Sequence, residues 1–167
     1  MRYIFALVLV LCITGSPFAQ NLLAPDNLFA GLGMEANAHT RKGFALSGGI
    51  LFGLDLTSQF AVGMKTAYSH NLDTVSAVEF QIFHRYYPTW LLRLINFEGF
   101  FVQQEAGCVI FYEFGEAFPA YINGLTLGWR FKFKQNWFWE PALRLGYPHI
   151  WGVGVIAGYS YSLNNDQ

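Results

Sequence analysis

The sequence is poor in charge and in cysteine, and it has no apolar run long enough to cross a membrane as a helix. Lysine, arginine, aspartate and glutamate make up 13% of its 167 residues, and a formal net charge of −1 leaves no basic surface for nucleic acid. Cys12 lies in an apolar leader, so Cys108 alone remains and a disulfide framework is excluded. The longest apolar run, Ile4–Ile13, is only half of the about 20 residues that a membrane-spanning helix needs.

The first residues have the three parts of a secretory signal. Arg2 supplies the basic start, Ile4–Ile13 supplies the apolar region, and Thr14–Ala19 ends on a small residue. We therefore expect residues 1–19 to be a signal peptide and residues 20–167 to form one exported domain. The alternative is a lipoprotein modified at Cys12, for which the preceding Leu11 is a poor fit.

Residues after the leader alternate with a period of two. In Phe44–Leu56 the even positions are mostly apolar and the odd positions are mostly small or polar, which is typical of a strand with two unlike faces. The pattern recurs between turn signals and predicts an all-β fold, an eight-stranded antiparallel up-and-down transmembrane β-barrel with its apolar face outward. The predicted strands are Leu28–Ala38, Phe44–Leu56, Phe60–Ser69, Ser76–Tyr87, Phe100–Tyr112, Tyr121–Phe133, Trp137–Tyr147 and Val153–Leu163.

The charged residues of the predicted strands fall on the face opposite the apolar one. A charge on the lipid face at mid-bilayer costs about 2–4 kcal/mol, and an unpaired charge in a narrow interior is also costly. We therefore expect paired charges inside the barrel, centred on Lys65, Glu79, Arg85, Glu105 and Arg130, with Glu105 and Arg130 as a candidate pair. The alternative is the solvated face of a soluble sheet. The predicted lumen charge network comprises Glu35, Asp55, Lys65, Glu79, Arg85, Glu105, Arg130, Lys132, Glu140 and Arg144.

Aromatic residues gather near both ends of the predicted strands. Amphipathic rings favour the two membrane–water interfaces, so this distribution predicts an aromatic girdle at each rim. Its predicted members are Tyr68, Tyr86, Tyr87, Trp90, Tyr112, Tyr121, Trp137, Trp139, Tyr147, Trp151, Tyr159 and Tyr161. The even number of strands places both chain ends on the periplasmic side.

Three segments, His84–Pro88, Gly99–Val102 and Phe138–Leu143, together with the leader and the eight strands, resemble small outer-membrane β-barrels of the OmpX, OmpA and OmpW type. The resemblance implies a place in the outer membrane of a double-membraned bacterium, with outer-membrane lipid and the barrel-assembly machinery as partners. Members of this group often end on an aromatic residue, whereas here Leu163 is followed by Asn164–Gln167.

The sequence offers little catalytic chemistry. Ser69 and His70 are the only adjacent serine and histidine, and neighbours on a strand point to opposite faces. We therefore expect no enzyme activity, no cofactor and no metal site. The expected function is a structural or surface role with a lumen plugged by charges. The alternative is binding or passage of small hydrophobic molecules, suggested by the inward apolar residues and implied by the resemblance to OmpW. The inward apolar residues are Leu51, Phe83, Phe101, Val109, Phe111, Phe138 and Ile156.

A protein with this alternation should need an amphiphile to fold. We expect the chain without its leader to fold in detergent micelles and to aggregate in plain buffer, because its apolar face has no partner in water. Circular dichroism and size-exclusion chromatography with and without detergent measure this. A soluble, monodisperse protein in plain buffer would contradict the prediction.

Overall fold

The computed structural model describes residues 27–39, 43–71, 75–88, 99–134 and 136–163. The predicted signal peptide, residues 1–19, and Trp90 of the predicted girdle lie outside these ranges. Within them, no helix has the length and apolar character of a membrane-crossing segment. The strands are β1 (Asn27–His39), β2 (Phe44–Asp55), β3 (Phe60–Asn71), β4 (Ser76–Tyr86), β5 (Phe100–Glu113), β6 (Glu116–Trp129), β7 (Phe131–Phe133), β8 (Trp137–Tyr147) and β9 (His149–Ser162).

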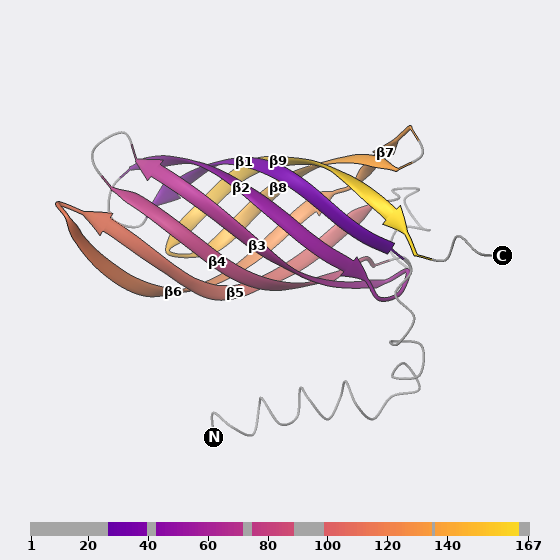
Figure 1. Cartoon of the computed structure of the whole chain (residues 1–167), viewed down its shortest axis with the longest axis horizontal. Helices are drawn as coiled ribbons and strands as arrows, with labels where there is room; N and C mark the ends of the chain where they lie inside the picture. Colours follow the sequence, from indigo (N-terminus) through magenta and orange to yellow (C-terminus); the bar gives the residue numbers. More distant parts are fainter. Residues whose placement is uncertain (1–26, 40–42, 72–74, 89–98, 135, 164–167) are drawn as a thin grey trace, which may run out of the picture.

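The strands form one antiparallel sheet that closes on itself (Figure 1). Apart from β6 and β7, each strand pairs with its neighbour along the chain, and β1 pairs with β9. Strands β6 and β7 are separated only by Arg130, and both pair with β8, so they form one stave of the barrel. The described residues therefore make a closed barrel of eight staves, which confirms the predicted fold class.

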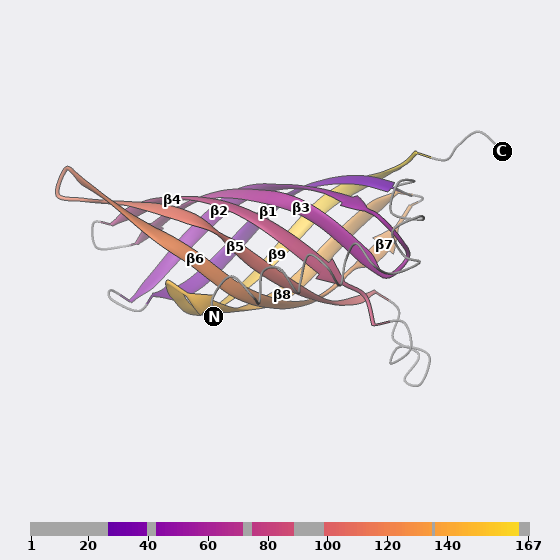
Figure 2. The same ribbon diagram turned by 90° about the horizontal axis from the view of Figure 1, so that it is seen from below.

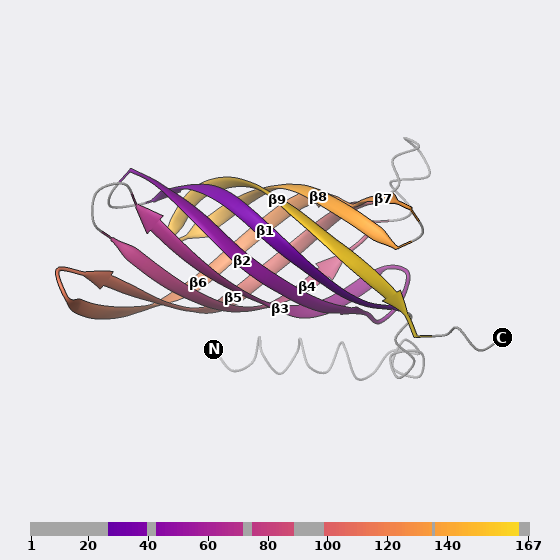
Figure 3. The same cartoon turned by 45° about the horizontal axis from the view of Figure 1, so that its top comes forward.

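The two ends of the barrel differ. Asn27 pairs with Ser162, so the start of β1 and the end of β9 lie at one end, which we call the proximal end. The opposite, distal end carries the β5–β6 hairpin, which projects beyond the other strands in both rotated views (Figures 2 and 3). Its turn is Phe114–Gly115, and both residues have positive φ angles, 50° and 84°.

This hairpin corrects one sequence prediction. The segment Glu113–Ala120 was expected to be a loop, but β6 already begins at Glu116. Pro119 is tolerated in this strand because β8 covers β6 only over Asn123–Gly128. Similarly, β9 begins at His149 and not at Val153.

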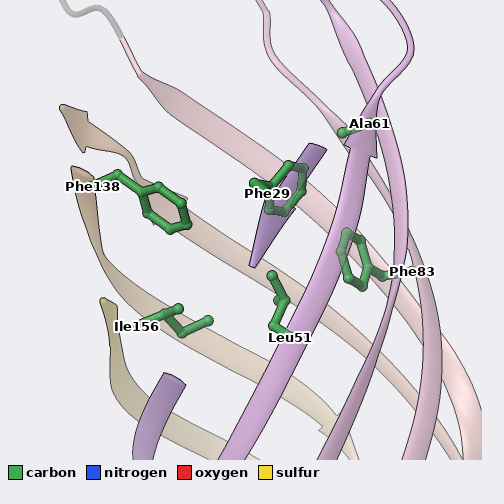
Figure 4. Close-up of a cluster of buried hydrophobic side chains, with 6 residues drawn as sticks. All are labelled: Phe29, Leu51, Ala61, Phe83, Phe138 and Ile156. Carbon is green, nitrogen blue, oxygen red and sulfur yellow. The ribbon is translucent and has the colours of Figure 1, made fainter. Parts of the chain in front are cut away.

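The two faces of the sheet differ as the alternation predicts. Outward side chains are apolar and open, with Leu32, Met34 and Ile82 exposed by 69%, 70% and 68%. Inward apolar side chains from six of the strands meet in the interior near the proximal end (Figure 4). This interior cluster comprises Phe29, Leu51, Ala61, Phe83, Phe138 and Ile156.

Four inward phenylalanines each lie over a glycine on the neighbouring strand. In each case a Cβ built on the glycine would overlap the phenylalanine ring. Each glycine is the direct cross-strand partner of its phenylalanine, and together the four pairs use all eight staves. An eight-stranded barrel has an interior just wide enough for side chains, and the missing Cβ atoms make room for the rings. The pairs are Phe29–Gly53, Phe83–Gly63, Phe101–Gly128 and Phe138–Gly158.

A matched pair of substitutions on β2 tests this packing. Gly53→Ala should destabilise the barrel by about 1–3 kcal/mol, because the Phe29 ring must leave its position to admit the methyl group. Gly48→Ala should change stability by less than about 0.5 kcal/mol, since a Cβ there meets only the Gly33 carbonyl oxygen at 4.0 Å. Urea unfolding in lipid vesicles measures both free energies. Equal effects of the two substitutions would contradict the packing argument.

Candidate functional site

The barrel interior holds ion pairs in two groups, one toward each end. The proximal group is built around Glu140 on β8, which is fully buried. Arg85 on β4 forms a bidentate pair with it, Nη1 to Oε1 at 2.8 Å and Nη2 to Oε2 at 3.0 Å. Arg130, between β6 and β7, donates from Nε to the same Oε1. The Nη1 of Arg130 also lies 3.5 Å from Oδ2 of Asp55, the last residue of β2. Two arginines and two acids are thus brought together from four staves.

Aromatic rings surround the two arginines of the proximal group. The guanidinium carbon of Arg85 lies 3.8 Å from the centre of the Phe101 ring. That of Arg130 lies 4.2 Å from the Phe29 ring and 4.6 Å from the Phe138 ring. Such cation–π contacts offset part of the cost of burying a cation, and more so when water is excluded. Phe29, Phe101 and Phe138, which pack over glycines, therefore also contact the guanidinium groups of the two arginines.

The distal group is built around Arg144 on β8. Its Nε lies 2.9 Å from Glu105 Oε2 on β5, and its Nη1 lies 3.2 Å from Glu79 Oε2 on β4. The same Nη1 is 3.5 Å from Glu35 Oε2 on β1, and Lys65 on β3 forms a second ion pair with Glu35. One arginine therefore faces three carboxylates from three different strands.

Amide and hydroxyl groups join the two groups into one network. The Oε1 of Gln103 on β5 accepts a hydrogen bond from Arg85 Nε at 2.8 Å, and its Nε2 donates to Glu105 Oε1 at 2.7 Å. Thr126 donates to the same Glu105 oxygen at 2.9 Å. Gln81 donates to Glu79 Oε2 at 2.6 Å. Gln103 and Thr126 thus supply partners for Glu105 Oε1, whose burial without a hydrogen bond would be costly in a low-dielectric interior.

Nine of the ten residues of the predicted lumen charge network take part in these ion pairs. The tenth, Lys132, does not. Lys132 on β7 stands opposite the inward Phe138, but it is exposed, because β7 lies at the proximal end of the barrel.

His149, at the start of β9, was missed by the sequence analysis. It is buried, and its Nε2 lies 2.8 Å from Glu79 Oε1. The sequence analysis missed His149 because the predicted last strand began only at Val153, whereas His149 comes earlier, directly after the tight turn at Pro148.

The predicted pairing of Glu105 with Arg130 is wrong. Glu105 is the direct cross-strand partner of Gly124, six residues before Arg130 on the same stave. Arg130 therefore lies nearer the proximal end, where it meets Asp55 and Glu140, while Glu105 meets Arg144. The alternation places each charge on a face, whereas the choice of partner depends on the stagger between strands.

Two small cavities lie among these side chains. One cavity of about 10 Å³ is lined by residues that include Glu35, Ser47 and Lys65, and another of about 10 Å³ adjoins Arg85 and Glu105. A volume of this size admits about one water molecule. Within the described residues, no group of three or more histidine, cysteine, aspartate or glutamate side chains is arranged so that it could hold a metal ion.

The predicted girdle residues that the structure describes lie toward the two ends of the sheet, with one correction. At the proximal end, Trp139 stacks on Phe131 with ring centres 4.9 Å apart, and Trp137 contacts Tyr159 at 5.4 Å. At the distal end, Tyr121 and Tyr147 stack at 4.9 Å. Further outward residues of the predicted set are Tyr68, Tyr86, Tyr112, Trp151 and Tyr161.

Tyr87 does not belong to the girdle. It follows the end of β4, where the strand alternation no longer determines its direction, and it packs against the interior cluster. Its hydroxyl oxygen accepts a hydrogen bond from Arg85 Nη1 at 3.3 Å, and its ring lies 6.2 Å from that of Phe101. Tyr87 is therefore a member of the proximal polar group.

One serine and one histidine on neighbouring strands meet on the outward face. Ser69 is buried and His70 exposed, so these two neighbours do point to opposite faces. However, His70 is the cross-strand partner of Ser76, and His70 Nδ1 lies 3.0 Å from Ser76 Oγ. The register of the β3–β4 hairpin brings them together, a signal that adjacency in the sequence does not carry.

The chain matches no protein-family model and no curated protein. Its structure resembles the N-terminal β-barrel domain of Pseudomonas aeruginosa OprF, at 13% identity and a TM-score of 0.53 over 83% of this chain and 98% of that one. It also resembles Neisserial surface protein A, at 11% identity and a TM-score of 0.54 over 82% of this chain and 96% of that one. Ail, the attachment invasion locus protein of Yersinia pestis, aligns at 9% identity with a TM-score of 0.48 over 83% of this chain and all of that one (100%). The first two likenesses show that this chain has the fold of the small outer-membrane barrels.

A double-mutant cycle tests the coupling in the distal group. Arg144→Met should cost about 3–5 kcal/mol, because it leaves buried carboxylates without their cation. Adding Glu105→Gln to Arg144→Met should cost less than the sum of the single losses, with a coupling of about 0.5–3 kcal/mol. Urea unfolding in lipid vesicles measures the three variants against the parent protein.

The control cycle combines Glu105→Gln with Lys132→Gln. Lys132 is exposed, so its loss should add to that of Glu105 within about 0.5 kcal/mol. Additive losses in both cycles would show that the interior charges act independently.

Proposed function

We propose that the protein is an integral outer-membrane barrel with a structural or surface role, whose lumen is plugged by its own paired charges. The observation that carries the proposal is the division of the two faces. Nine charged side chains and His149 form one interior network, while the outward face presents exposed apolar residues such as Leu32 and Met34. In this proposal the lumen carries no chemistry. The proposed location is the outer membrane of a double-membraned bacterium, where lipid surrounds the barrel and the barrel-assembly machinery inserts it.

The network supports a plug because its members cross the lumen. Arg85 on β4 reaches Glu140 on β8, and Glu79 on β4 reaches Arg144 on β8, at positions 55 and 65 residues apart in the chain. Each pair spans staves that are not neighbours in the sheet. A water-filled channel would instead leave such charges at the wall, each solvated separately.

The alternative proposal is binding or passage of small hydrophobic molecules, and the interior cluster is the feature that favours it. Its apolar residues line the proximal half of the lumen, but they pack against the guanidinium groups of the proximal group. An incoming molecule would have to displace Phe29 or Phe138 from both a glycine and an arginine. This packing favours the plug.

Conductance in planar lipid bilayers tests the plug. We expect the folded protein to give no stepwise conductance, because in this proposal the paired charges close the lumen to water and ions. The variant Lys134→Ala is the control: it removes an exposed charge that lies outside the lumen network, so it should give no conductance either. Discrete conductance steps from both proteins would overturn the plug. Saturable quenching of tryptophan fluorescence by naphthalene, lost when Leu51 is replaced by Trp, would support the alternative.

A further inference from the structure

Three polar side chains meet on the outward face of the β3–β4 hairpin, outside the lumen network. His70 Nδ1 lies 3.0 Å from Ser76 Oγ. The Tyr68 hydroxyl donates a hydrogen bond to the same Ser76 oxygen, also at 3.0 Å. Tyr68 and His70 are exposed and Ser76 is half-buried. We call this group the rim triad.

The hydrogen bonds of the rim triad have a direction. Ser76 Oγ accepts the hydrogen of the Tyr68 hydroxyl and keeps its own hydrogen to donate to His70 Nδ1 when that nitrogen is an acceptor. This holds in the imidazole tautomer that carries its proton on Nε2. A serine that donates to a neutral imidazole is the arrangement that makes a hydroxyl nucleophilic, since the ring takes the proton as the oxygen attacks. The bond from Tyr68 stabilises negative charge on that oxygen.

The position of the rim triad fits a lipid substrate. Ser76 is the cross-strand partner of Tyr112, one of the exposed aromatic residues of the distal rim. Such rings mark the membrane–water interface, and the ester bonds of lipids lie at this level, between headgroup and acyl chain. The serine therefore lies at the depth of the bond that it would attack.

An apolar track leads from the rim triad toward the middle of the barrel. Tyr68 pairs with Val78, Thr66 with Phe80, and Met64 with Ile82, all on the outward face of β3 and β4. Phe80, Ile82 and Met64 are exposed by 51%, 68% and 60%. An acyl chain lying along this track would place its ester group next to Ser76.

We propose that the rim triad is an esterase site for acyl esters of membrane lipids. Ser76 Oγ attacks the ester carbonyl carbon while its proton passes to His70 Nδ1. The carbon–oxygen bond to the lipid alcohol then breaks, and the alcohol leaves with the proton from His70. Water, deprotonated in turn by His70, hydrolyses the acyl–serine ester, releasing the fatty acid and restoring Ser76. Tyr68 is a positioning residue that acts through the serine oxygen.

The test uses the folded full-length barrel in lipid micelles with p-nitrophenyl palmitate as the probe. We expect turnover that falls by about 10²–10⁴-fold in Ser76→Ala and in His70→Asn, the range typical of a lost nucleophile or general base. Tyr68→Phe should lower kcat and leave KM unchanged. His84→Asn, which removes the outward histidine of β4, is the matched control and should keep full activity.

A second measurement does not depend on turnover. A long-chain alkyl fluorophosphonate should label Ser76, identified by mass spectrometry of the protein, and His70→Asn should abolish the labelling. The heat-dependent shift in gel mobility shows that each variant is folded. Absence of both turnover and labelling in the folded parent protein would overturn the proposal. So would turnover that Ser76→Ala leaves intact, and either result would leave the plug unaffected.

Discussion

The ion pairs that Glu140 makes with two arginines are the interaction on which the barrel interior depends. A carboxylate with no solvent exposure is stable only if cations and hydrogen bonds replace its water. Arg85 supplies a bidentate pair, Arg130 supplies a third contact, and Asp55 brings the group to neutrality. Arg130 reaches this position at the point where its stave is interrupted between β6 and β7, and its backbone N–H donates to the Gly99 carbonyl at 2.8 Å. The residue that interrupts the strand, Arg130, is thus the same residue whose buried charge pairs with Glu140.

The phenylalanines make that burial possible in so narrow a space. A ring can pack against a glycine and still present its π face to a guanidinium, as Phe29 does between Gly53 and Arg130. A branched aliphatic side chain would fill similar space but offer the cation no negative face. Glycine in a strand weakens it, and here the loss is offset by ring packing and by the cation contacts that the rings permit. The abundance of glycine on the inward face therefore has a packing reason at these positions.

Much of the fold could be predicted from the sequence, because the strand period is a local property. The inward direction of Leu51, Phe138 and Glu140 follows from alternation alone. The partners of the charges could not be predicted in this way, since Glu105 meets Arg144 through the stagger of distant strands. Tyr87 was misplaced because it lies one residue beyond the strand that defined its direction. The contact between His70 and Ser76 required the hairpin register, which a sequence read strand by strand leaves out.

The uncovered edge of β6 has a consequence for how copies of this protein behave beside one another. Between Glu116 and Ile122 the strand has β5 on one side and lies beyond the reach of β8 on the other. An exposed strand edge is a template on which a second chain can extend the sheet. Pro119 carries no N–H, so an incoming strand finds no donor at the middle of this edge. The hairpin can therefore leave aromatic side chains such as Phe118 exposed beyond the other strands without starting sheet growth from one molecule to the next.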